Sequence, residues 1–223
     1  MAEHLKTIRI PDYTKSEEKF NSISHFVGVV LSIIGFLILL LKTLTVSFSA
    51  RNLISSIVCG LSFILLFSGS SVYHYLDVNN KKRIMRVFDH CNVYIAISGA
   101  YTPFLLTKIY DYDKSTALKI LVIMWCLVLA LVVMTFVNMD GFKELLHTCY
   151  VAMGVAVMVS FIPFGKVFGK NCLCLIVCGG VLAAIGAVMY GVGSKKKWFH
   201  SIFHVIILVS CIFFYLSIAL YVI

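Results

Sequence analysis

The chain has 223 residues, of which 61% are hydrophobic and only 13% are charged. Soluble domains carry about a quarter charged residues, so this composition excludes a water-soluble protein and indicates an integral membrane protein. The net charge of +9 does not indicate a nucleic-acid partner, because the lysines and arginines are dispersed over loops that flank apolar segments.

Residues 1–25 form a polar segment of mixed charge. The segment lacks the apolar stretch and the small-residue cleavage site of a secretory signal. We therefore predict a polar cytosolic N-terminal segment, and we expect the first apolar segment after it to remain in the membrane.

Seven apolar segments follow, each about as long as the 20 residues that a helix needs to cross a bilayer. The loops between them are short, so consecutive helices are expected to be antiparallel neighbours. The sequence predicts an all-α fold, a single membrane domain over residues 1–223 that forms a seven-helix transmembrane bundle. The predicted helices cover residues 26–44, 53–76, 87–106, 118–137, 145–164, 172–192 and 199–221.

The distribution of lysine and arginine predicts the orientation of the bundle. The densest basic groups, at residues 81–86 and 195–197, both fall in loops on the same side as the N-terminus. Cytosolic loops are enriched in these residues. We therefore expect a cytosolic N-terminus, a C-terminus outside the cell, and a multi-pass protein of the plasma membrane.

Ionisable side chains gather at the predicted cytosolic ends of three helices. His74 closes the second helix, Asp89 opens the third, and His200 and His204 open the seventh. Alternating topology brings these three helix ends to one face of the membrane. Histidine and aspartate are costly near hydrocarbon and persist there mainly in functional sites.

The spacing of the histidines is typical of metal ligation. His200 and His204 are four residues apart and so share one helix face, and His74 supplies a third imidazole. Three histidines with one open position are typical of catalytic zinc, which prefers imidazole ligands. Alternatively, histidines near an interface can simply hydrogen-bond a backbone carbonyl or extend toward the headgroups.

Ser70 and Asp89 are the candidate catalytic residues. Ser70 lies one helical turn before His74 on the same face, where its hydroxyl can bind the metal's water or a substrate oxygen. Asp89 can accept a proton from that water or orient an imidazole. The alternative for Asp89 is a helix cap, because it falls in the first turn of the predicted third helix.

Three further polar residues are predicted at the rim of the site, before the first apolar segment. Asn21 and His25 have the same four-residue spacing, and Glu18 lies just outside them. We expect them to contribute polar contacts rather than metal ligands.

These motifs, taken in order, resemble the haemolysin III family, which is related to the progestin and adiponectin receptors and more distantly to the alkaline ceramidases. The resemblance covers nearly the whole chain. The matching elements are Glu17-Glu18-x-x-Asn21-Ser-x-Ser-His25, Ser70-x-x-x-His74, Asp89-His90 followed by Gly99-Ala-Tyr-Thr-Pro-Phe104, and His200-x-x-x-His204.

The resemblance implies a seven-helix bundle with a cytosolic N-terminus and a Zn²⁺ ion near the cytosolic leaflet. It also implies that the metal ligands are His74, His200 and His204. Asp89 would hold the metal's water and Ser70 would support the site.

Three functions are compatible with this pattern. The first is a zinc-dependent hydrolase of lipid amide or ester bonds, similar to a ceramidase, with a membrane lipid as substrate. The second is a pore-forming or cytolytic protein with a structural metal, although a pore favours polar residues along the full membrane depth. The third is a lipid-sensing receptor without turnover, although the chain has no sizeable domain outside the membrane to carry a signal.

Overall fold

The computed structural model describes residues 8–161, 165–193 and 196–223, and within these ranges it contains helices and no strand, as predicted. The last three residues of the predicted helix 145–164 lie outside the described residues. The long helices are α2 (Lys15–Thr45), α3 (Ala50–Tyr75), α4 (Asn80–Phe104), α6 (Lys114–Asn138), α7 (Lys143–Phe161), α9 (Lys170–Gly193) and α10 (Phe199–Tyr221). The short elements are the π-helix η1 (Leu105–Ile109), α5 (Tyr110–Tyr112) and α8 (Gly165–Phe168).

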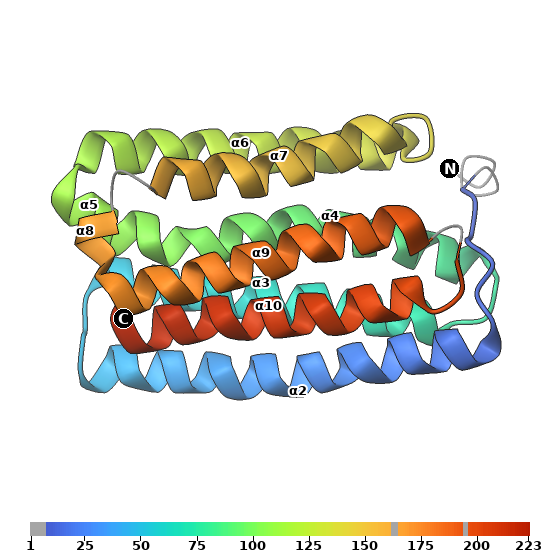
Figure 1. Ribbon diagram of the computed structural model, residues 1–223, viewed down its shortest axis with the longest axis horizontal. Coiled ribbons are helices and arrows are strands. Elements are labelled where there is room, and N and C mark those ends of the chain that lie inside the picture. Colours follow the sequence, from blue (N-terminus) through green and yellow to red (C-terminus); the bar gives the residue numbers. More distant parts are fainter. Residues whose placement is uncertain (1–7, 162–164, 194–195) are drawn as a thin grey trace.

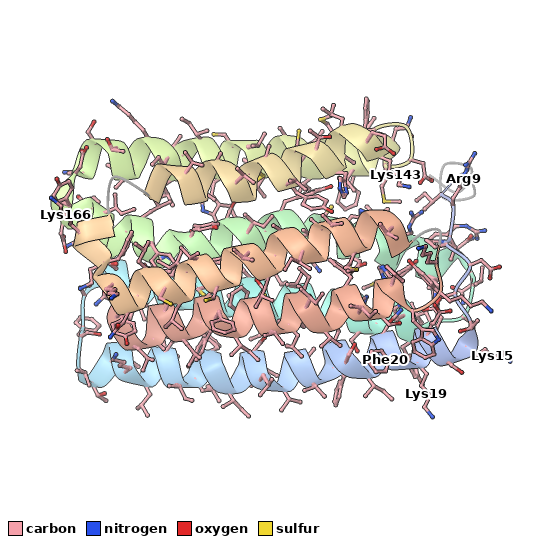
Figure 2. All side chains as sticks on the ribbon, viewed as in Figure 1. Arg9, Lys15, Lys19, Phe20, Lys143 and Lys166 are labelled. Carbon is pink, nitrogen blue, oxygen red and sulfur yellow. The ribbon has the colours of Figure 1, made fainter. Side chains whose placement is uncertain are left out.

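The long helices lie side by side in one bundle and alternate in direction (Figure 1). The start of α2, the end of α3 and the starts of α4 and α10 therefore meet at the same end. Figure 2 shows Arg9, Lys15, Lys19 and Lys143 at this end and Lys166 at the opposite end. This grouping follows from the alternating helix directions, while the orientation of the bundle in a membrane stays a prediction.

Five of the described helices, α2, α3, α6, α9 and α10, have the length and apolar composition to cross a membrane. Their outer faces expose large apolar side chains, including Phe26 and Leu41 on α2 and Ile123 on α6. Apolar surface of this extent is incompatible with water and suits contact with lipid. The chain is therefore an integral membrane protein.

Helices α4 and α7 correspond to the predicted spans 87–106 and 145–164 but are not among those five. Helix α4 has a less apolar composition than those five because it lies between other helices. It packs against α3, α6, α7 and α10, and its polar residues, such as Asn92 and Ser98, are buried against these neighbours. Side chains covered by protein need not be apolar. The count of seven spans thus stays a prediction.

Helix α2 begins at Lys15, well before the predicted start at residue 26. Thr14 caps it by accepting a hydrogen bond from the backbone of Glu17, and the Glu17 carboxylate accepts one in return from the backbone of Thr14. This reciprocal capping box satisfies backbone donors that the first turn leaves unpaired. The added turns extend α2 alongside the histidine-bearing ends of α3 and α10.

Helices α3 and α4 approach each other closely at Gly69. A side chain at this position would collide with the amide of Asn92, which donates a hydrogen bond of 2.7 Å to the carbonyl oxygen of Leu65. Small residues allow this kind of contact between membrane helices. The contact holds the part of α3 that carries Ser70 and His74 against the part of α4 that carries Asp89.

Replacing Gly69 with alanine is expected to destabilise the protein, because the new methyl group displaces the Asn92 amide from its hydrogen bond. We expect a loss of about 1 kcal/mol, the usual value of one such bond, measured by thermal unfolding of the purified protein in detergent. Gly154→Ala is the control, since nothing lies within 4 Å of a methyl group there. Equal unfolding temperatures for the two variants would contradict the proposed role of Gly69.

Candidate metal centre

Three imidazole rings converge at the end of the bundle where α3 ends and α10 begins. The Nε2 atom of His200 lies 3.3 Å from Nε2 of His74 and 3.1 Å from Nε2 of His204. All three residues are buried, and their candidate ligand atoms lie within 4.8 Å of one another. The structure therefore brings together the three histidines that the sequence predicted as metal ligands.

The spacing of these nitrogen atoms fits one cation. Zinc binds imidazole nitrogen at about 2.0–2.1 Å in tetrahedral geometry, which places two neighbouring ligand atoms about 3.3 Å apart. Two of the three pairwise separations, 3.1 and 3.3 Å, match this value, and all three ligand atoms lie within 4.8 Å of one another. Three buried imidazoles whose ring nitrogens lie this close together can therefore hold a metal ion, and three protein ligands leave a coordination position open.

Two contacts fix the start of α10, which carries two of the three histidines. Trp198 precedes α10 in the left-handed conformation, with a φ of 66°, and its backbone N–H donates a hydrogen bond of 2.6 Å to Oε1 of Glu17. At the end of α9, Gly193 packs so closely that a side-chain carbon would lie 3.0 Å from the backbone nitrogen of His200. Helices α2 and α9 thus set where the His200 ring lies.

Ser70 and Asp89 face the same cavity as His200 and His204, and the Ser70 side chain hydrogen-bonds the Asp89 carboxylate. The alternative of Asp89 as a helix cap is wrong. Helix α4 begins at Asn80, and its cap is the side chain of Asn79. Asp89 lies about two turns inside the helix, so its carboxylate is available to the site.

The predicted rim residues lie beside the imidazoles rather than at an open edge, and His25 lines the same cavity as His200 and His204. Asn21 and His25 are fully buried, and Nε2 of His25 lies 3.3 Å from the carbonyl oxygen of His204. The rings of His25 and His204 are 3.8 Å apart between centroids. Glu18 contacts the site directly, with Oε2 2.6 Å from Nδ1 of His74. The early start of α2 explains these positions.

Several residues of the site were missed by the sequence analysis. The ring of Tyr13 stacks on His200 with a centroid distance of 4.8 Å, and the Tyr190 ring lies 5.9 Å from the same imidazole. The buried ammonium group of Lys82 pairs with Glu18. The capping sequence that follows Tyr13 could have placed this residue beside the start of α2. Local sequence carries no comparable signal for Tyr190 or Lys82.

A cavity of about 220 Å³ adjoins the imidazoles. His200, His204, Ser70 and Asp89 line it together with many apolar side chains from α3, α4, α7, α9 and α10. Small residues on two of these helices leave the space open, namely Gly154 on α7 and Gly180, Ala183, Ala184 and Ala187 on α9. The candidate metal centre therefore faces an enclosed, largely apolar space.

Comparison with known proteins places these residues in a family context. A family model described as "Haemolysin-III related" matches residues 13–215, a range that includes every residue of the candidate site. A hemolysin-3 homolog of Bacillus subtilis is 29% identical over 209 residues, which cover 91% of this chain and 96% of that protein. Hemolysin-3 of Bacillus cereus is 27% identical over 216 residues, which cover 94% and 96% of the two chains. The resemblance inferred from the motifs is confirmed.

Purified protein is expected to contain about one metal ion per chain, because the three imidazoles form one site. The variant His204→Ala should lose that ion, since two imidazoles alone bind it weakly. Elemental analysis of the protein after gel filtration measures both. His147→Ala is the control, because His147 pairs with the hydroxyl of Tyr150 and is not one of the three ligands. Equal metal content in the His204→Ala variant would rule out this site.

Proposed function

The chain belongs to the haemolysin-III-related family, and we propose that it hydrolyses an amide or ester bond of a membrane lipid with a zinc ion held by His74, His200 and His204. One observation carries the proposal: the three imidazoles lie together, and two of them, His200 and His204, face one apolar cavity with the Asp89 carboxylate inside a membrane protein. This arrangement suits a substrate whose reactive bond lies next to a hydrocarbon chain.

We further propose that α4 and α7 cross the membrane with the five apolar helices, which gives seven spans. Both lie parallel to those helices in the bundle (Figure 1). The distribution of lysine and arginine then favours a cytosolic N-terminus and places the site near the cytosolic leaflet. We also propose that this membrane is the plasma membrane, so that the N-terminus faces the cytosol and the C-terminus lies outside the cell. Lipids would reach the site from within the bilayer.

The donor set favours zinc over other ions, because three imidazole nitrogens suit this metal and leave a position for a reactant. A zinc ion bound there would polarise the carbonyl group of the lipid and make water a stronger nucleophile at neutral pH. The protein residues then have separate tasks. The Asp89 carboxylate accepts the proton that the attacking water loses, and the Ser70 hydroxyl keeps that carboxylate oriented through its hydrogen bond.

The cavity supports a lipid rather than a water-soluble substrate. Its lining includes Phe63, Leu66, Ile97 and Phe214, which lie beyond the polar end formed by the histidines, Ser70 and Asp89. An acyl chain packed against these side chains would stay in an apolar environment, as it does in the bilayer, and would hold the polar bond at the imidazoles. Asp89 would then meet the reactive bond at the boundary between the polar and apolar parts of the lipid.

The names of the relatives, hemolysin-3 and its homolog, favour a second candidate, a cytolytic protein with a structural metal. A pore through the bundle would be supported by polar side chains along its whole length. Among the described residues, the buried histidines and the Glu18–Lys82 ion pair lie at the end where α2 begins, while buried polar side chains near the opposite end, such as Thr43 and Ser56, are hydroxyls that hydrogen-bond each other. This distribution supports the hydrolase more strongly than a pore within one chain.

Replacing Asp89 with asparagine should lower hydrolysis of a ceramide-like lipid about 100-fold or more, which is the usual contribution of a general base. Metal content should stay unchanged, because Asp89 is not a ligand. The assay measures fatty acid released from proteoliposomes that contain the lipid. Asp111→Asn is the matched control, since Asp111 is exposed and pairs with Arg51 far from the cavity.

The same proteoliposomes distinguish the alternatives. Full turnover by Asp89→Asn, or turnover that survives removal of the metal, would contradict the proposed mechanism. Leakage of an enclosed dye without lipid cleavage would favour the cytolytic protein. Saturable lipid binding without any product would favour the lipid-sensing receptor.

A further inference from the structure

The carboxylate of Glu18 joins three helices beside the candidate metal centre. Glu18 belongs to α2, and its Oε2 atom lies 2.6 Å from Nδ1 of His74 at the end of α3. Its Oε1 atom accepts a hydrogen bond of 2.7 Å from the ammonium group of Lys82 at the start of α4. Both oxygen atoms are therefore engaged, each by a different helix.

The contact with His74 determines how this ring is protonated. The Nε2 atom of His74 faces His200 at 3.3 Å, and a ring nitrogen that ligates a metal carries no proton. In the neutral ring the proton then resides on Nδ1, and this N–H group donates a hydrogen bond to the Glu18 carboxylate. A carboxylate in this position fixes the tautomer and the orientation of a ligand histidine and makes it a stronger donor to the metal.

The contact with Lys82 fixes the carboxylate in turn. The Lys82 side chain is only 2% exposed, and its ammonium group also donates to the carbonyl oxygen of Leu76 at 2.9 Å and lies 5.0 Å from the centre of the Tyr73 ring. Among the described residues, Glu18 is the only carboxylate that pairs with this ammonium. A buried ammonium requires such a partner, so Lys82 and Glu18 hold each other in place.

We propose that Glu18 and Lys82 are positioning residues of the metal centre. Lys82 holds the Glu18 carboxylate, and Glu18 holds His74 in the tautomer and orientation that direct Nε2 toward the ion. This inference rests on the proposed metal site and does not depend on hydrolysis. Among the described ion pairs, His74 is the only one of the three histidines with a carboxylate partner. Glu18 therefore acts on one ligand selectively.

The neighbouring residue Glu17 provides a matched comparison. It lies on the same turn of α2 and is buried, whereas Glu18 is half-buried. Its carboxylate accepts hydrogen bonds from the backbone of Trp198 and from the backbone and hydroxyl of Thr14, and in these interactions it contacts none of the three imidazoles. Glu17 thus supports the helix ends, whereas Glu18 acts on a ligand.

The test is the zinc affinity of Glu18→Gln, measured by competition with a chelator on the purified full-length protein. Glutamine keeps the size of the side chain and one acceptor oxygen but removes the charge. We expect binding that is 10- to 100-fold weaker, the usual effect of losing such a partner. Glu144→Gln is the control and should stay within about threefold of wild type, because Glu144 is an exposed residue at the start of α7 and takes part in none of the described ion pairs with the imidazoles.

A spectroscopic measurement separates positioning from general stability. With Co²⁺ in place of zinc, the visible absorption of Glu18→Gln should shift, because a weaker His74 donor changes the ligand field of the ion. The spectrum of the Glu144→Gln protein should match that of wild type. Unchanged affinity together with an unchanged spectrum for a folded Glu18→Gln variant would overturn the proposal.

Glu18→Gln leaves the buried ammonium of Lys82 without its carboxylate partner, which can impair folding. A double-mutant cycle with Lys82→Met covers this case, because the double mutant has no buried ammonium to leave unpaired. Lys82 acts through Glu18, so its replacement should weaken zinc binding in the wild-type background and have no further effect beside Glu18→Gln. Additive losses would contradict this dependence. A wild-type protein that binds no zinc would refute the metal site itself, whereas normal wild-type binding with an unaffected Glu18→Gln variant would refute only the positioning role.

Discussion

The structure depends on one constraint: three imidazole rings buried at one end of an apolar bundle share a single focal point. Buried polar groups are tolerated in a membrane protein when partners satisfy them. A bound cation would satisfy the three Nε2 atoms at once, and Glu18 satisfies the remaining nitrogen of His74. To bring these atoms together, the end of α3 and the start of α10 must lie side by side, and α2 must extend far enough to cover both.

Other features of the bundle follow from this arrangement. Helix α4 is polar because it lies between other helices and carries Asp89 to the cavity and Lys82 to Glu18. Gly69 lets α3 approach α4 closely enough for Ser70 to reach Asp89. Glycine and alanine on α7 and α9 leave the apolar cavity beside the imidazoles. The polar chemistry and the lipid-sized space are therefore built by the same helix contacts.

Patterns within single segments and the alternation of helix direction predicted the helices and the meeting of His74 with His200 and His204. The four-residue spacing of His200 and His204 and the alternation of helix directions along the chain were sufficient to predict this meeting. Contacts between distant residues were not predictable in this way. Lys82 was assigned to a basic cytosolic loop, yet it is buried against Glu18, 64 positions earlier in the chain. The capping box at Thr14 extended α2, and a start of α4 at Asn80 moved Asp89 inside its helix.

The most direct test of the central claim is X-ray absorption at the zinc edge of the purified, metal-loaded protein. The account predicts a four-coordinate ion with three imidazole nitrogens at about 2.0–2.1 Å and one oxygen ligand that does not come from the protein. Substitution of any one of the three histidines should remove the bound zinc and its absorption signal, because two imidazoles alone bind the ion weakly. A first shell dominated by sulfur or by oxygen, with no imidazole scattering, would contradict the assignment of these three histidines as the metal centre.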